Sequence, residues 1–136
     1  MDAAQALADL TEISSQVVHV AVLDDDGGVL ATTIADEGRA ARFVQGVTTL
    51  LAEAEALRQA RGLPTLSQLE AATLEGSVFV VRRDEAEGGA RVIAATTRPD
   101  PTVGLVFYDL KHCLRAIGEA SGNGRRRRTR KAADGS

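Results

Sequence analysis

The stretch Glu37–Arg61 carries the longest helical pattern in this 136-residue chain. Apolar residues recur on one face of a helix with 3.6 residues per turn, at Phe43, Val47, Leu50, Ala54 and Leu57. Asp36 is suited to cap the N-terminus of this helix, and Gly62 followed by Pro64 ends it. At 1.5 Å per residue the helix is about 37 Å long. A helix of that length spans a small sheet, so the rest of the chain must supply one.

Two strands are predicted before this helix and three after it. Val17–Leu23 and Val29–Ile34 are rich in β-branched residues and flank the turn pair Asp26-Gly27, a pattern typical of a hairpin. The later strands are Leu66–Leu74, Ser77–Arg83 and Arg91–Arg98. The first of these is ambiguous, because Leu, Gln, Glu and Ala also favour helices. We interpret it as an edge strand, because Glu75-Gly76 turns tightly into the next strand.

Amphipathic helices are predicted at both ends of this arrangement. Asp2 to about Ser14 places Leu7, Leu10 and Ile13 on one helical face. Near the other end, Asp100 is a capping residue and Pro101 suits the first helical position. The last helix, from Pro101 to about Ala120, has an apolar stripe of Val103, Val106, Leu110, Cys113, Leu114 and Ile117.

The element order defines an α/β fold, α-β-β-α-β-β-β-α, with a five-stranded, mostly antiparallel sheet and helices on both faces. The two terminal helices can share one face, which leaves the long central helix to cover the other. At this length the chain forms a single domain, which we place at residues 1–121.

The charge of the chain is divided between an acidic body and a basic tail. Residues 1–121 carry 10 Lys and Arg against 18 Asp and Glu, a net charge of −8, whereas residues 122–136 carry 6 against 1, a net charge of +5. The tail has no apolar residue larger than Ala and is predicted to be disordered. It could contact nucleic acid, an anionic membrane or an acidic protein surface. The basic residues that would make this contact are Arg125, Arg126, Arg127, Arg128, Arg130 and Lys131.

The tail also has two simpler interpretations. It could only keep the protein soluble, or it could touch the acidic body of its own dimer. No aromatic residue lies among its basic residues for base stacking, so nothing favours sequence-specific recognition of nucleic acid.

Composition favours a soluble, cytoplasmic protein. The one cysteine excludes an internal disulfide and suits a reducing compartment. The N-terminal residues lack the basic start and apolar run of a signal peptide, and no apolar run approaches the ~20 residues that span a bilayer.

The sequence predicts no catalytic residue, no metal site and no cofactor, and therefore no enzyme. Asp24-Asp25-Asp26 lacks the spread of ligands of a calcium loop and fits a solvated hairpin tip. His19 and His112 have no ligand partner at metal spacing, and Cys113 fits a small core residue. A phosphate-binding loop of the form G-x-x-x-x-G-K-[ST] is absent, so the protein is not expected to bind GTP itself.

The chain resembles the roadblock/LC7 family, whose small α/β domains are related in fold to profilin and longin domains. The resemblance covers Ala3 to Ala120 and rests on the order and spacing of its parts, because none of them is a catalytic fingerprint. These are the hairpin VVHVAVLDDDGGVLATT, the long central helix, the strand pair SVFVVRRDEAEGGARVIAATT and the closing helix PTVGLVFYDLKHCLRAIGEA. The stretch LPTLSQLEAATL departs from the family pattern, because it is more helix-prone than the usual third strand.

The resemblance implies a homodimer in which two central helices pack together and two third strands pair. It also implies a partner, a small Ras-like GTPase, which bacterial members regulate and sometimes activate. The apolar stripe from Phe43 to Leu57 is expected to face the protein's own sheet, whereas the neighbouring flank is expected to face the second subunit or partner. The predicted interface residues are Val44, Thr48, Leu51, Glu55, Leu66, Gln68 and Glu70.

Two other function classes remain open at this point. One is an adaptor that binds nucleic acid or an anionic membrane through the tail, and the other is a small-molecule sensor, since related folds hold ligands. If a GTPase is bound, no arginine is placed as an obvious arginine finger. Regulation is then expected to work by repositioning the switch loops of the GTPase.

Overall fold

The computed structural model describes the backbone of residues 1–85 and 89–134, with side-chain surroundings for residues 1–84 and 90–118. The elements follow the predicted order and are α1 (Ala3–Ile13), β1 (Val17–Leu23), β2 (Val29–Thr32), α2 (Glu37–Arg61), β3 (Gln68–Thr73), β4 (Gly76–Glu85), β5 (Gly89–Thr97) and α3 (Val103–Asp134). The predicted α/β fold class is therefore confirmed, and the ambiguous stretch around residue 70 is a strand.

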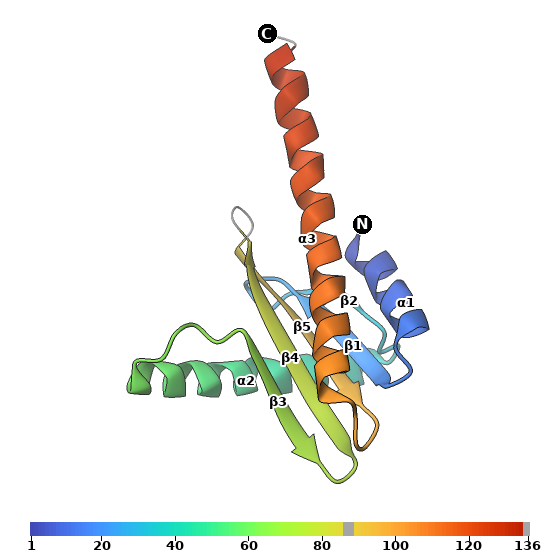
Figure 1. The fold of residues 1–136 in the computed structure, drawn as a ribbon, viewed down its shortest axis with the longest axis vertical. Coiled ribbons are helices and arrows are strands. Elements are labelled where there is room, and N and C mark those ends of the chain that lie inside the picture. The colour runs from blue at the N-terminus through green and yellow to red at the C-terminus, as the bar shows by residue number, and fades with distance from the viewer. Residues whose placement is uncertain (86–88, 135–136) are drawn as a thin grey trace.

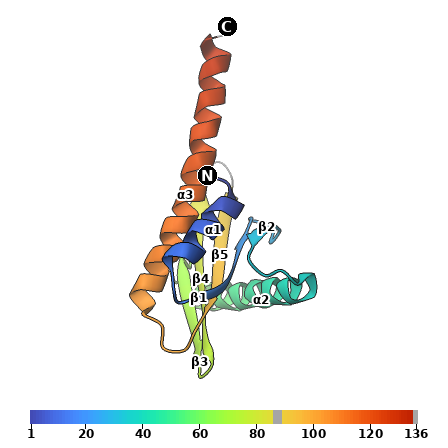
Figure 2. The same cartoon turned by 90° about the vertical axis from the view of Figure 1, so that its right-hand side faces the viewer.

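The five strands form one antiparallel sheet in the order β2-β1-β5-β4-β3. β3 lies at one edge, as predicted, and β2 lies at the other. Figures 1 and 2 show α1 and α3 together on one face of the sheet and α2 on the opposite face. The sheet therefore separates two faces of the molecule, one covered by α1 and α3 and the other by α2.

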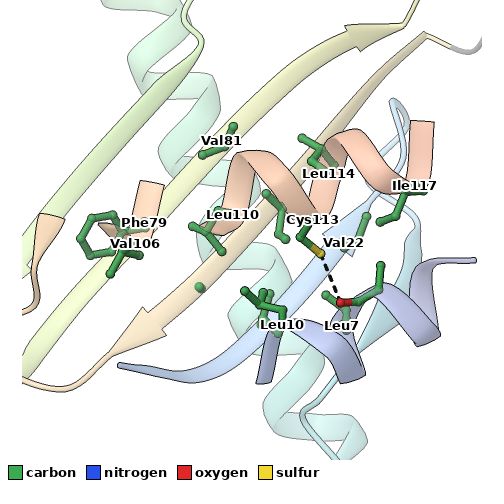
Figure 3. Close-up of a cluster of buried hydrophobic side chains, with 14 residues drawn as sticks. Leu7, Leu10, Val22, Phe79, Val81, Val106, Leu110, Cys113, Leu114 and Ile117 are labelled. Carbon is green, nitrogen blue, oxygen red and sulfur yellow. Dashed lines mark hydrogen bonds between the residues drawn. The ribbon is translucent and has the colours of Figure 1, made fainter. Parts of the chain in front are cut away.

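Two apolar clusters lie on the two faces of the sheet. The larger one joins α1 and α3 to the sheet through fully buried side chains such as Phe79, Val106, Leu110 and Leu114 (Figure 3). The smaller one lies under α2 and is centred on Val47, the single buried residue of that helix. The face under α1 and α3 is therefore packed more completely than the face under α2.

Local capping explains where the first two helices begin and end. Asp2 accepts a hydrogen bond from the backbone N–H of Gln5 at 2.8 Å, and Asp36 accepts one from the N–H of Arg39 at 2.9 Å. Gly62 ends α2 in the left-handed conformation, with φ of 66°. The caps at Asp36 and Gly62 match the predictions, and the cap at Asp2 is a finding of the structure.

The start of α3 differs from the prediction. The helix begins at Val103, because Asp100 has a positive φ of 54° and therefore turns the chain instead of capping it. The backbone N–H of Thr102 is directed to the side-chain oxygen of Gln16, and the carbonyl of Thr102 accepts the first helical hydrogen bond from Val106 at 3.0 Å. The helix thus starts two residues after Pro101.

The far end of α3 also differs from the prediction. The helix was expected to end near Ala120, but the described backbone continues as helix to Asp134. The disorder expected over 122–136 stays a prediction. Arg, Lys and Ala have high helix propensity, which favours helix beyond Gly124. Residues 135–136 lie outside the described residues.

Two residues predicted on apolar faces are exposed. Ile13 is 67% exposed at the end of α1, and Val103 is 40% exposed at the start of α3. Both residues lie at helix ends, Ile13 at the last position of α1 and Val103 at the first position of α3.

Candidate partner-binding surface

More residues of α2 contact the sheet than the sequence pattern predicted, and most of them are only partly buried. Phe43 and Leu50 on one side of Val47, and Val44 and Leu51 on the other, are all partly buried against the same cluster. Val44 and Leu51, predicted to lie on the flank toward a second subunit, are thus partly buried against the protein's own sheet and partly exposed, and their contact with a second subunit stays a prediction. Residues on both sides of Val47 are partly buried because Val47 is the residue of α2 that is most deeply packed on the sheet.

The C-terminal half of α2 has little of the protein beneath it. Figure 1 shows α2 continuing beyond the sheet on the side of β3. Leu57, predicted to face the sheet, is instead 61% exposed, and Leu63 just after the helix is 53% exposed. The sequence pattern continues past the edge of the sheet, so apolar side chains remain in contact with solvent at this end.

A groove of about 330 Å³ lies between α2 and the end of the β1–β2 hairpin. It brings together four of the seven predicted interface residues, Thr48, Leu51, Glu55 and Leu66. Leu23, Ala90 and Val92 form part of its apolar floor, and the acidic hairpin tip, Asp24 to Asp26, forms one wall. The remaining helix residue of the set, Val44, lies one turn before Thr48, whose hydroxyl donates a hydrogen bond to the Val44 carbonyl at 2.9 Å.

The other two predicted interface residues, Gln68 and Glu70, lie on the edge strand β3 and do not line this groove. Beside the β3–β4 pair, the N–H of Arg82 donates to the carbonyl of Ser67 at 2.8 Å, and the register Gln68↔Val81, continued by one residue, places these two residues opposite each other. In an antiparallel pair, hydrogen-bonded residues alternate along the strand. The backbone groups of Gln68 and Glu70 therefore point away from β4, toward the open edge.

A charge pair orders the C-terminal end of α2. The guanidinium of Arg58 donates from Nε to Oε1 of Glu55 at 2.8 Å and from Nη1 to the carbonyl of Leu63 at 3.0 Å. The hydrogen bond from Arg58 lowers the pKa of Glu55 below its usual value, against partial desolvation, and the charge of Arg82 lowers it further. Glu55 thus faces the groove as a carboxylate already paired on its own helix.

The acidic hairpin tip has a structural role at its first residue. The Oδ1 atom of Asp24 accepts hydrogen bonds from the N–H groups of Asp26, at 2.9 Å, and Gly28, at 2.8 Å. Gly27 has a φ of 83°, as its place in the predicted turn requires. Within residues 1–85 and 89–134 there is no group of three or more His, Cys, Asp and Glu residues arranged to hold a metal ion.

The remaining residues considered in the sequence lie away from this surface. His19 is half-buried on β1, and its backbone N–H donates to the Thr96 hydroxyl at 3.2 Å. His112 and Cys113 lie on α3, on the other face of the sheet. Arg125 to Lys131 lie on the last turns of α3, where only the backbone is described. No helix in the described part of the chain is long and apolar enough to cross a membrane.

Three solved structures are similar in fold to this chain. A roadblock/LC7 domain from Streptomyces avermitilis aligns with a TM-score of 0.57 and 24% identity, over 83% of this chain and 95% of that chain. A second roadblock/LC7 domain from Streptomyces avermitilis gives a TM-score of 0.73 and 14% identity, over 86% and 95%. The gliding protein MglB from Thermus thermophilus gives a TM-score of 0.69 and 16% identity, over 86% of each chain.

The chain therefore has the roadblock/LC7 fold, which confirms the resemblance predicted from the sequence. No protein-family model and no curated protein matches it.

Proposed function

We propose that this protein is a cytoplasmic, homodimeric interaction module that binds and regulates a small Ras-like GTPase. The observation that carries the proposal is the uncovered apolar surface of α2 beside the open edge of β3, in a roadblock/LC7 fold. The enzyme in such a complex would be the GTPase, and this chain would act on it as a binding partner.

The α2 surface supports the homodimer part of the proposal. Only one residue of this 25-residue helix is fully buried, and the half-buried Val44 and Leu51 still expose apolar area. Burying the exposed parts of such side chains is worth roughly 25 cal/mol per Å² of apolar surface. A second α2 packed across the first would gain this energy, and a second β3 could pair with the outward backbone groups of Gln68 and Glu70.

Fold likeness supports the GTPase part. The resemblance to roadblock/LC7 domains implies a small GTPase as partner, and the solved structures of similar fold include the gliding protein MglB. Two arginines beside the groove already have acidic partners, Arg58 with Glu55 and Arg82 with Asp84, the latter at 3.3 Å. An arginine finger must be available to the transition state, so we propose that the dimer acts by repositioning the switch loops of the GTPase.

The proposal is tested first by light scattering at micromolar concentrations, where the full chain is expected to have the mass of a dimer. Thr48→Arg places a charge at the groove and is expected to shift the mass toward the monomer. The matched control is Thr49→Arg, because the next residue on α2 is exposed and does not line the groove. A chain that stays monomeric on concentration would contradict the homodimer.

The second test uses the small GTPases of the source cell, each loaded with GDP or with a GTP analogue. Nucleotide-dependent binding to the wild-type chain is expected with one of them, together with a changed rate of GTP hydrolysis or nucleotide release. Equal binding of both loaded forms by every GTPase, with unchanged rates, would contradict the regulatory function.

A further inference from the structure

The opposite face of the molecule carries a second groove, between α1 and α3. A cavity of about 100 Å³ lies there, with a floor formed by Ala6, Leu10, Cys113 and Ala116. This is smaller than the ~150 Å³ that holds a benzene molecule, so it suits one slender side chain. Figure 2 shows that α1 and α3 lie across the sheet from α2, so the groove is separate from the surface proposed for the dimer and the GTPase.

The floor of the groove is held in place and carries no charge. The thiol of Cys113 donates a hydrogen bond to the carbonyl of Ala6 at 3.5 Å, which joins α3 to α1 (Figure 3). Burial, and then the charge of Asp9, raises the pKa of Cys113 to about 11, so the thiol stays protonated near neutral pH. The floor is therefore suited to methylene groups.

Two carboxylates lie at the rim of the groove, beside Met1, Ile13 and His112. Asp9 on α1 and Asp109 on α3 both line the cavity, and no Lys or Arg side chain among the described residues lines it. Asp9 accepts a hydrogen bond from the side chain of Gln5 at 2.9 Å, and neither carboxylate forms a salt bridge within the part of the chain whose side chains are described. Two carboxylates above an apolar floor favour a cation with an apolar stem.

An aromatic surface lies beside the same rim. The ring of Tyr108, which is 66% exposed, stacks on the ring of His112 with centroids 6.3 Å apart and planes within 8°. A guanidinium stacks well on aromatic rings, and its three methylene groups pack against apolar surface. Together the floor, the carboxylates and the rings match an arginine side chain better than a lysine.

The chain itself supplies arginines of the required kind. Residues 1–121 have a net charge of −8, and residues 122–136 have a net charge of +5 with five arginines. In the continuous helix α3, Arg125 lies about 14 Å beyond Ala116 along the axis. Figure 1 shows this end of α3 directed away from the body. The segment therefore cannot reach its own groove without breaking the helix, but it can reach the groove of another molecule.

We propose that the groove between α1 and α3 receives an arginine from the segment Arg125–Lys131 of a second copy of this chain. The arginine stem lies on the floor formed by Leu10 and Cys113, and its guanidinium pairs with Asp9 and Asp109. This association is independent of the proposed α2 dimer, since it uses the opposite face. If both occur, tail exchange links dimers into larger assemblies.

The first test measures the size of the full chain by sedimentation velocity at about 0.1 M and about 1 M NaCl, where the Debye length falls from roughly 10 Å to 3 Å. Larger species are expected at low salt and are expected to dissociate at high salt. Two variants are expected to lose the larger species: Asp9→Asn with Asp109→Asn, and a chain in which all six basic tail residues are replaced by Gln. Unchanged size between the two salts would overturn the proposal.

The matched control is Asp25→Asn with Asp26→Asn, which removes the same charge from the exposed hairpin tip. This control is expected to behave as the wild type. If it loses the larger species as completely as the groove variant does, the association depends on net charge alone and the proposal is overturned. Thr48→Arg separates the two proposals, because it acts on the α2 face and is expected to leave the salt-sensitive step intact.

The second test uses a fluorescent peptide of residues 122–136 and the full chain with the neutral tail. Fluorescence anisotropy is expected to show that the peptide binds this chain. Asp9→Asn with Asp109→Asn in the same chain is expected to weaken the affinity for the peptide roughly tenfold or more, because charge-assisted hydrogen bonds are lost. Duplex DNA and phosphatidylserine vesicles are measured in parallel. A peptide that binds DNA or vesicles but binds the groove variant as well as the parent would overturn the proposal.

Discussion

Phe79 on β4 packs edge-to-face against Phe107 on α3, with ring centroids 4.9 Å apart and ring planes at 75°. Phe79 is completely buried, and the ammonium group of Lys111 lies 5.9 Å from the centroid of the Phe107 ring. Aromatics are scarce in this chain, with three Phe, one Tyr and no Trp. Two of the three phenylalanines therefore join the first turns of α3 to β4.

Removing the inner ring is expected to cost a large part of the stability. Phe79→Ala leaves a cavity under α3 and is expected to lower the free energy of unfolding by about 3–5 kcal/mol, against a typical total of about 5–15 kcal/mol. Chemical denaturation monitored by circular dichroism measures this change. A double-mutant cycle with Phe107→Ala is expected to give a coupling of about 0.5–1.5 kcal/mol. A loss below about 1 kcal/mol for Phe79→Ala would contradict this packing.

A methyl group at Gly76 is expected to be far less tolerated than one at Gly46. Gly76 has a φ of 152°, and a Cβ atom there would lie 2.2 Å from the carbonyl oxygen of Thr97, so the backbone must move. Gly76→Ala is therefore expected to destabilise by about 1–3 kcal/mol. Gly46 lies within α2 with nothing within 4 Å of such an atom, and Gly46→Ala is expected to stabilise by up to about 1 kcal/mol. Thermal unfolding measures the change in melting temperature of each variant. Equal changes in the two variants would contradict the expectation.

The parts of the fold that the sequence predicts well depend on neighbouring residues only. Asp36 and Gly62 mark the ends of α2 because capping involves residues three or four positions away. The hairpin around Gly27 is predicted for the same reason. By contrast, the sequence could not show that Asp100 turns the chain with a positive φ, because the approach of Gln16 to Thr102 joins residues far apart in the sequence.

Burial was predicted less well, because it depends on where the sheet ends. Leu57 continues a regular helical pattern but is exposed, and α2 continues beyond the sheet on the side of β3 (Figure 1). In the candidate site, Thr48, Leu51 and Glu55 meet because they share a helix face, which their spacing shows. Asp9 and Asp109 line the same cavity only because α1 packs on α3. The helical patterns of α1 and α3 in the sequence do not indicate this packing. The one local signal was Tyr108, a large aromatic residue outside the predicted stripe.

Cys113 is expected to be unreactive in the folded protein. Its pKa of about 11 means that little thiolate exists at pH 8, and burial also restricts access. A thiol-reactive dye is expected to label the native chain many times more slowly than the chain unfolded in guanidinium chloride. Labelling at equal rates in the two states would show that α1 does not cover the thiol.

The raised pKa of Cys113 also sets a direction for stability at alkaline pH. The unfolded thiol loses its proton near its ordinary pKa of 9.0, whereas the folded thiol keeps it to about 11. The folded state then binds more protons, so stability is expected to fall as pH rises from about 9 to 11. Cys113→Ala is expected to flatten this part of the stability profile, which denaturation at several pH values measures. A profile as steep as that of the wild type would assign the fall to other groups.

The edge of β3 offers a test that separates backbone pairing from side-chain contact. The N–H of Glu70 points away from β4, so Glu70→Pro removes a hydrogen-bond donor from the open edge and leaves the β3–β4 ladder intact. Because this position lies at a sheet edge, the variant is expected to fold, with a melting temperature within a few degrees of the wild type. If two β3 strands pair in the proposed homodimer, Glu70→Pro is expected to weaken dimerisation at least tenfold by light scattering, whereas Glu70→Ala, which keeps the N–H, is expected to have little effect. Equal dimerisation of the two variants would place the contact on α2 alone, because a helix-mediated dimer does not use the β3 backbone.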